Sequence, residues 1–136
     1  MRLDQDRTMR FVVESIRSMP PSWESYSPER LTGALKSGRI VLVTFSADWD
    51  ATCYSHEKQS INSLTSYRAL RSNGIVTLRA DYTHFDPSVV ELMKKNGIST
   101  VPAFAMYSPK APDVPVILRD LVSEAQLIEA IEYARM

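Results

Sequence analysis

The sequence has few cysteines, glycines and histidines, and neither sign of charge is in excess. Cys53 is the single cysteine, so no disulfide can form within the chain and the fold cannot depend on one. The 16 basic and 16 acidic residues balance, which argues against a nucleic-acid-binding protein. No apolar run approaches the ~20 residues that span a bilayer, and we expect no signal peptide or membrane-spanning helix in this sequence.

The residues that are present are typical of an ordered globular protein. The 136 residues are 44% hydrophobic, which suffices for a core without disulfides or metals. We expect a helical extension over residues 1–21, with its helix between Gln5 and Arg17, and one domain over residues 22–136. The extension either packs on the domain or serves as a membrane linker or partner-binding helix.

Strand and helix patterns alternate along the domain. We expect strands over residues 23–26, 40–45, 75–80, 103–107 and 114–118. Helices are expected to begin at Ser27-Pro28, Ala51, Asp86-Pro87 and Ser123. The order βαβαβαββα predicts an α/β fold with a mixed sheet, in which the first strands are parallel and the last pair is antiparallel.

Three local predictions refine this outline. The helix from Ala51 is weakened at Asn62-Ser63 and ends near Asn73-Gly74. The proline-rich segment 108–113 is expected to form a turn. The last helix has Ser123 and Gln126 at capping-box spacing, and its predicted inner face consists of Leu127, Ile128 and Ile131.

The segment from Ile40 to Tyr54 has the pattern of a buried strand, a short polar turn and the start of a helix. Asp50 stands where the helix N-cap is expected, and Cys53 follows three residues later. A helix N-terminus is electropositive and lowers the pKa of a thiol, so redox proteins place nucleophilic cysteines there. Here a carboxylate occupies the first such position, and one thiol is left.

This segment resembles a known redox site. Residues 47–53, Ala-Asp-Trp-Asp-Ala-Thr-Cys, are similar to the Ala-Asp-Trp-Cys-x-x-Cys site of the thioredoxin superfamily, as found in the C-terminal domain of DsbD-type thiol:disulfide interchange proteins. The likeness covers roughly residues 26–136 and includes Glu57, residues 61–63 and 78–83, Asp86-Pro87 and Val101-Pro102. It implies a thioredoxin-like three-layer α/β/α sandwich with an extra N-terminal helix. It also implies a periplasmic or membrane-associated location, as an independent protein or as part of a membrane-anchored one.

The resemblance also implies roles for individual residues. Trp49, Asp50 and Thr52 correspond to the active-site positions. The resemblance places Tyr54, Val101 and Pro102 in a substrate groove, with a cis peptide bond before Pro102 that presents backbone groups to an extended peptide. Peptide binding of this kind needs no cysteine. Trp49 has a second interpretation, as a packing aromatic that holds the turn while its tip meets water.

Disulfide exchange by a dithiol protein consumes two sulfurs, and Asp50 replaces the first. We therefore expect no two-thiol reductase activity and favour binding of a protein or peptide partner through the old groove. Thr44 stands where many relatives carry a buried carboxylate, and its hydroxyl is expected to bond locally. Two alternatives remain. One is a monothiol protein that uses Cys53, although the nearby Asp50 charge would raise the thiol pKa. The other is a structural domain of a larger assembly.

The remaining polar residues near Cys53 predict little chemistry. Asp50 is expected to cap the helix, with a role as ligand or general base as the alternative. Asp50, Cys53, His56 and Glu57 share a spacing that could hold a metal, but the ligand set is not a recognised one. We expect no metal and no cofactor. His84 is expected on the surface.

Overall fold

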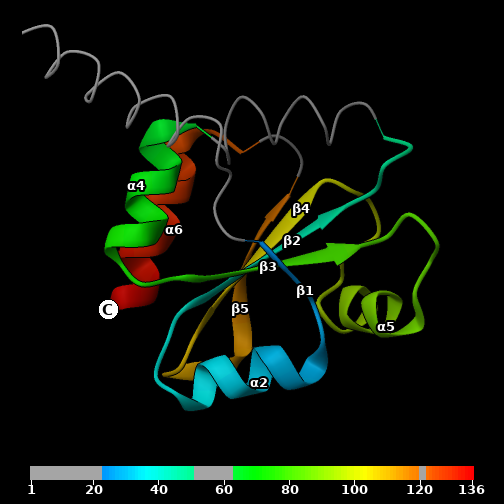
Figure 1. The fold of residues 1–136 in the computed structure, drawn as a ribbon, viewed down its shortest axis with the longest axis horizontal. Helices are drawn as coiled ribbons and strands as arrows, with labels where there is room; N and C mark the ends of the chain where they lie inside the picture. The colour runs from blue at the N-terminus through cyan, green and yellow to red at the C-terminus, as the bar shows by residue number, and fades with distance from the viewer. Residues whose placement is uncertain (1–22, 51–62, 120–121) are drawn as a thin grey trace, which may run out of the picture.

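The computed structural model describes residues 23–50, 63–119 and 122–136. Its sheet has the strand order β1-β3-β2-β4-β5. The strands are β1 Glu24–Ser25, β2 Val41–Ser46, β3 Val76–Asp81, β4 Ala103–Ser108 and β5 Ala111–Arg119. The helices are α2 Pro28–Lys36, α4 Leu64–Ser72, α5 Pro87–Lys95 and α6 Glu124–Arg135. The predicted thioredoxin-like α/β fold with a mixed sheet is confirmed (Figure 1).

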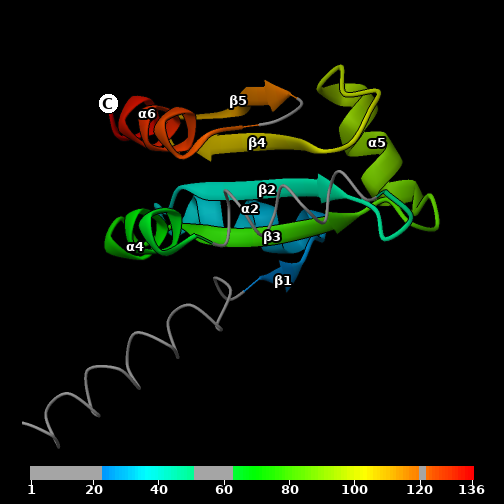
Figure 2. The same cartoon turned by 90° about the horizontal axis from the view of Figure 1, so that it is seen from above.

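The sheet combines parallel and antiparallel pairs. β1 and β2 both run parallel to β3, whereas β4 pairs antiparallel with β2 and with β5. As a result, the ends of β2 and β3 and the start of β4 meet at one edge of the sheet. Figure 2 shows the loops that follow β2 and β3 side by side, next to α5. This edge brings together segments that are more than thirty residues apart in the sequence.

Alternation along the strands divides the core between the two faces of the sheet. Val41, Val43 and Phe45 of β2 belong to a cluster that includes side chains of α2 and α5. Leu42, the residue between the first two, belongs to a second cluster with α4 and α6. Every residue of β2 is buried because helices cover both faces of this central strand. The sheet is thus the middle layer of three.

Three of the four predicted helix starts, at Ser27-Pro28, Asp86-Pro87 and Ser123, are confirmed. Ser27 and Asp86 cap α2 and α5, and each is followed by a proline in the first turn. Ser123 and Gln126 form the expected capping box at the start of α6. Ser63, which was expected only to weaken a helix, instead caps α4: its side chain accepts a hydrogen bond from the Ser66 N–H. Short polar side chains therefore begin all four of the described helices.

Two predictions about the C-terminal third were wrong. The turn expected over residues 108–113 is confined to Pro109 and Lys110, because β5 begins at Ala111, which pairs with Ser108. Pro112 fits this strand because β5 lies at the sheet edge, where a missing N–H is tolerated. In α6 the predicted inner residue Ile128 is only half-buried. The buried face repeats at helical spacing as Leu127, Ala130, Ile131 and Ala134.

Several predictions fall outside the described residues. These are the helix between Gln5 and Arg17, the boundary at residues 21 and 22, and the helix expected from Ala51. Within the described ranges, no helix combines the length and the apolar character that crossing a bilayer requires.

Candidate functional site

Thr83 anchors the turn that follows β2. The Asp48 N–H donates to Thr83 Oγ1 over 2.9 Å, and Trp49 Nε1 donates to the Thr83 carbonyl oxygen over 3.2 Å. The turn is closed by a hydrogen bond from the Asp50 N–H to the Ala47 carbonyl oxygen at 3.1 Å. The orientation of Trp49 is therefore set by a residue thirty-four positions later in the chain.

Asp81, the last residue of β3, in turn holds Thr83. Its Oδ1 accepts hydrogen bonds from the Thr83 N–H, at 2.9 Å, and from the Thr83 hydroxyl. Partial burial opposes ionisation of the Asp81 carboxyl, but these bonds outweigh it and, with the Arg79 charge, lower its pKa. The ionised carboxylate, the hydroxyl and the Asp48 N–H thus form one connected chain of hydrogen bonds.

Three aromatic rings surround this anchor. The ring centroid of Trp49 lies 6.2 Å from that of Tyr82 and 6.4 Å from that of Phe85. Tyr82 and Phe85 meet edge to face with centroids 4.9 Å apart. Trp49 remains 56% exposed and Phe85 57% exposed. We call these three residues the aromatic trio. Two large aromatics that contact each other while exposed form a more unusual feature than scattered apolar residues.

The peptide bond between Val101 and Pro102 is cis, as the resemblance implied. Ala103 pairs with Phe45, so Pro102 lies beside the end of β2, where the Trp49 turn begins. Pro102 is buried and Val101 is half-buried. Within the described ranges, the backbone of Val101 forms no hydrogen bond. The cis segment therefore places next to the Trp49 turn a piece of backbone that has no hydrogen-bond partner in the described part of the chain.

The structure brings some of the predicted site residues together and leaves others undescribed. Trp49, Asp50, Val101 and Pro102 lie at the same edge of the sheet, with Asp50 half-buried. Thr52, Cys53, Tyr54, His56 and Glu57 lie outside the described residues. The capping role of Asp50, the metal-spacing hypothesis and the thiol chemistry of Cys53 therefore stay predictions.

Sequence reasoning missed the residues that hold the turn. Tyr82 and Thr83 lie in a segment that resembles the family, but the sequence predicts no role for either residue. Phe85 carried one local signal, a large apolar residue inside a polar loop. It has φ 55°, an uncommon conformation for a bulky side chain, immediately before the α5 cap. Their contacts with Trp49 depend on the pairing of β2 with β3, which no local pattern reveals.

Thr44 departs from its prediction. Its side chain is 2% exposed, and its hydroxyl oxygen has no hydrogen-bond partner among the described residues. The expectation that this hydroxyl bonds locally is therefore wrong, because in the middle of a strand the nearby carbonyl groups are committed to neighbouring strands. His84 is exposed, as expected. In the described part of the chain, no cluster of three metal-ligating side chains occurs.

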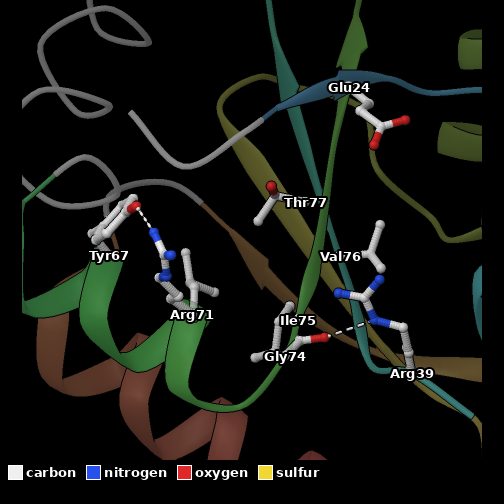
Figure 3. Close-up of a pocket in the computed structure, with 9 residues that line it drawn as sticks. Glu24, Arg39, Tyr67, Arg71, Gly74, Ile75, Val76 and Thr77 are labelled. Atoms are coloured by element: carbon white, nitrogen blue, oxygen red, sulfur yellow. Dashed lines mark hydrogen bonds between the residues drawn. The ribbon is translucent and has the colours of Figure 1, made fainter. Parts of the chain in front are cut away.

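A separate surface pocket of about 360 Å³ lies at the opposite end of β3 (Figure 3). Arg39 Nε donates to the Gly74 carbonyl oxygen at 3.0 Å, and Arg71 Nη1 donates to Tyr67 Oη at 2.7 Å. Leu70, Ile75 and Val76 contribute apolar surface. None of the residues predicted from the redox motif lines this pocket.

A family model described as thioredoxin-like matches residues 22–109, which is more than half of the chain. The chain belongs to the thioredoxin-like family. This result agrees with the cis peptide bond beside the Trp49 turn and with the strand order of the sheet.

Individual relatives of this thioredoxin-like domain support the predicted relationship to DsbD. The thiol:disulfide interchange protein DsbD of Vibrio cholerae is 29% identical over 85 residues, which are 62% of this chain and 14% of that protein. A thioredoxin from Thermus thermophilus has a similar structure, with a TM-score of 0.70, 23% identity and coverage of 86% of this chain and 88% of that chain.

The oxidised C-terminal domain of DsbD from Neisseria meningitidis is also similar. It has a TM-score of 0.64, 19% identity and coverage of 82% of this chain and 98% of that chain. At such identities the structural likeness shows the shared fold. The chain spans only a small part of the DsbD protein that it matches in sequence.

Proposed function

We propose that this thioredoxin-like domain binds an extended segment of a protein partner and does not catalyse two-thiol disulfide exchange. The binding surface would consist of the aromatic trio with Val101 and Pro102. We call it the Trp49 surface. It lies where the resemblance puts the substrate groove of the family. The location proposed with this function is periplasmic or membrane-associated, which rests on the likeness to DsbD-type proteins alone.

The observation that carries the proposal is the exposed and oriented Trp49. An indole that is 56% exposed leaves much of its apolar surface in water, yet Thr83 fixes its nitrogen. A rigid aromatic side chain that loses little entropy on binding is a common anchor of protein interfaces. The backbone of Val101 beside it, which forms no hydrogen bond with another described residue, adds groups that can form strand-like hydrogen bonds with an extended peptide.

The chemical half of the proposal rests on the number of sulfur atoms. The first thiol of a dithiol protein attacks a substrate disulfide, and the second attacks the mixed disulfide and releases the product. This chain has only Cys53, and Asp50 holds the first position of the motif. A carboxylate cannot form a mixed disulfide. The scaffold can still present a peptide-binding surface, because that task uses backbone and aromatic groups.

The binding test uses an immobilised library of short extended peptides of mixed charge and apolar content. We expect wild-type protein to bind a subset, and Trp49→Ala to weaken that binding about tenfold, as loss of an interface anchor does. Tyr133→Ala is the matched control, because Tyr133 is an aromatic residue on α6 that is 65% exposed and remote from the motif. Equal loss with both variants, or no binding at all, would refute the proposed surface.

The catalytic test is insulin reduction in the presence of dithiothreitol. We expect the wild-type protein to leave the rate of insulin precipitation unchanged. Acceleration that disappears on Cys53→Ser would contradict the proposal and favour the monothiol alternative. A protein that neither binds peptides nor accelerates reduction would favour the structural-domain alternative.

A further inference from the structure

Each aromatic residue of the trio has an exposed aspartate next to it in the sequence. Asp48 precedes Trp49, Asp81 precedes Tyr82, and Asp86 follows Phe85. All three carboxylate residues are exposed, while Trp49 and Phe85 are the most exposed rings of the trio. Each ring of the trio therefore has an exposed acidic residue as a sequence neighbour, and this local excess of negative charge disfavours anionic ligands.

Two of these carboxylates are held in place by short local hydrogen bonds. Asp81 Oδ1 accepts from Thr83, and Asp86 Oδ1 accepts from the Ser88 N–H at 2.9 Å and from Ser88 Oγ at 2.7 Å. The Ser88 hydrogen bonds lower the pKa of Asp86, and that of Asp81 is lowered as well. Both groups are therefore ionised and oriented at neutral pH.

Two basic residues of this region, Arg79 and His84, act on Asp81 and help to lower its pKa. Arg79 Nε donates to Ser46 Oγ at 3.3 Å, and His84 is exposed in the same loop as Phe85. Within the described ranges, none of Asp48, Asp81 and Asp86 forms a salt bridge. Each ring of the aromatic trio thus has an aspartate next to it in sequence, and among the described residues Arg79 and His84 are the positive groups that act on Asp81.

We propose that the partner segment bound by the Trp49 surface is cationic: an extended peptide that alternates apolar residues with lysine or arginine. Its apolar side chains would pack on the aromatic trio, and its positive side chains would meet the bordering carboxylates. Exposed aromatic faces attract cations as well, with Trp49 the strongest of the three. This inference rests on the proposed function and adds the chemistry of the partner to it.

The expected selectivity is modest because the charges are exposed. Each exposed ion pair or cation–π contact changes affinity by roughly two- to fivefold at low salt. Two or three such contacts give a cationic peptide about a tenfold advantage over an anionic peptide of the same apolar sequence. Screening shortens the reach of these charges to about 8 Å at physiological ionic strength, so the advantage shrinks as salt is added.

The experiment compares two labelled peptides by fluorescence anisotropy at low and at physiological salt. Both alternate valine and tyrosine with a charged residue, which is lysine in one peptide and glutamate in the other. We expect the lysine peptide to bind about tenfold more tightly at low salt, with the difference reduced at higher salt. Trp49→Ala should weaken binding of both peptides.

The variant test replaces Asp48 and Asp86 together by asparagine. Asparagine is as good an N-cap as aspartate, so Asp86→Asn preserves the start of α5. The double variant should lose most of the preference for the lysine peptide over the glutamate peptide, and its binding of both peptides should still be weakened by Trp49→Ala. Asp113→Asn, at an exposed position on β5, is the control and should change nothing.

Three outcomes would overturn the inference. If both peptides bind wild type equally, the proposed function stands and the cationic partner does not. If the lysine peptide binds regardless of Trp49→Ala or of the double variant, it binds at another surface. If neither peptide binds, the inference fails together with the proposed function.

Discussion

Thr83 and Asp50 show how much of this site depends on single residues. Thr83 uses three different groups: its hydroxyl oxygen accepts from the Asp48 N–H, its carbonyl oxygen accepts from Trp49 Nε1, and its own N–H donates to Asp81 Oδ1. Asp50 occupies the position at which the family motif has its first cysteine. Thr83 therefore orients the proposed binding surface, and Asp50 is the residue on which the predicted absence of two-thiol exchange depends.

The loss of that chemistry is testable by one substitution. Asp50→Cys restores the family spacing of two thiols, so the variant should accelerate insulin reduction by dithiothreitol, whereas the wild type should not. The matched control is Asp48→Cys, which adds a thiol to the same turn at a spacing that the motif does not use. A folded Asp50→Cys protein that remains as inactive as the control would show that the site differs from its relatives in more than one residue.

At the scale of whole elements, local capping accounts for where the helices begin, and packing accounts for their buried faces. The capping box of α6 is reciprocal: Ser123 Oγ accepts from the Gln126 N–H at 3.1 Å, and Gln126 Oε1 accepts from the Ser123 N–H at 2.8 Å. The face that follows buries Leu127 and Ile131 against the sheet. In β5 the neighbouring strand overrides the turn tendency of Pro112, because pairing with β4 gives backbone groups their partners.

The cap of α6 has a measurable effect on stability. Ser123→Ala removes the side-chain acceptor for the Gln126 N–H, so the free energy of unfolding should fall by about 1 kcal/mol. Urea denaturation followed by circular dichroism measures this change. Ser123→Asp retains an acceptor and adds a favourable charge at the helix N-terminus, so it should remain close to wild type. Equal destabilisation by both substitutions would show that the cap does not contribute in this way.

At the scale of the whole molecule, ionisable groups limit the pH range of stability at both ends. Hydrogen bonds from Ser88 lower the pKa of Asp86; those from Thr83 lower the pKa of Asp81 despite partial burial. Burial raises the pKa of Tyr107, although Asn96 Nδ2 donates to its hydroxyl at 3.0 Å. Burial likewise raises the pKa of Tyr26, with smaller contributions from Tyr107, Glu91 and Glu29.

These shifts predict a stability maximum between about pH 4 and pH 10. The two aspartates contribute stability above their unfolded pKa of about 3.9, and this contribution is lost as the pH falls through their lower folded pKa values. The contribution of the tyrosines is complete below about pH 10 and is lost as the pH rises through their higher folded pKa values. The free energy of unfolding, measured by denaturation from about pH 2 to pH 11, should therefore decline at both ends of this range.

One substitution tests whether Asp81 is responsible for the loss of stability at low pH. Asp81→Asn removes one titrating group and should flatten the decline below about pH 4, whereas Asp113→Asn should leave it unchanged. A decline at low pH that is identical in Asp81→Asn and wild type would mean that other groups control stability there.

Much of the fold could be predicted because its signals are local. Two helix starts are each indicated by a pair of adjacent residues, Ser27-Pro28 and Asp86-Pro87. A run of apolar and β-branched residues predicts β2. The α6 face was predicted only in part, since Ile128 is apolar yet lies one residue away from the buried face. The candidate site was predicted through resemblance at Trp49 and Pro102, but its anchor Thr83 was not.

The sequence by itself determined the order of strands and helices, most helix caps and the presence of one thiol where disulfide exchange needs two. These are properties of short segments or of composition, so nearby residues suffice to decide them. Only the tertiary structure decided that β3 pairs with β2, which brings the Thr83 loop to Trp49, and that the Thr44 hydroxyl is buried without a partner among the described residues. Such contacts join distant segments, and their geometry depends on the packing of both faces of the sheet, which no local sequence pattern encodes.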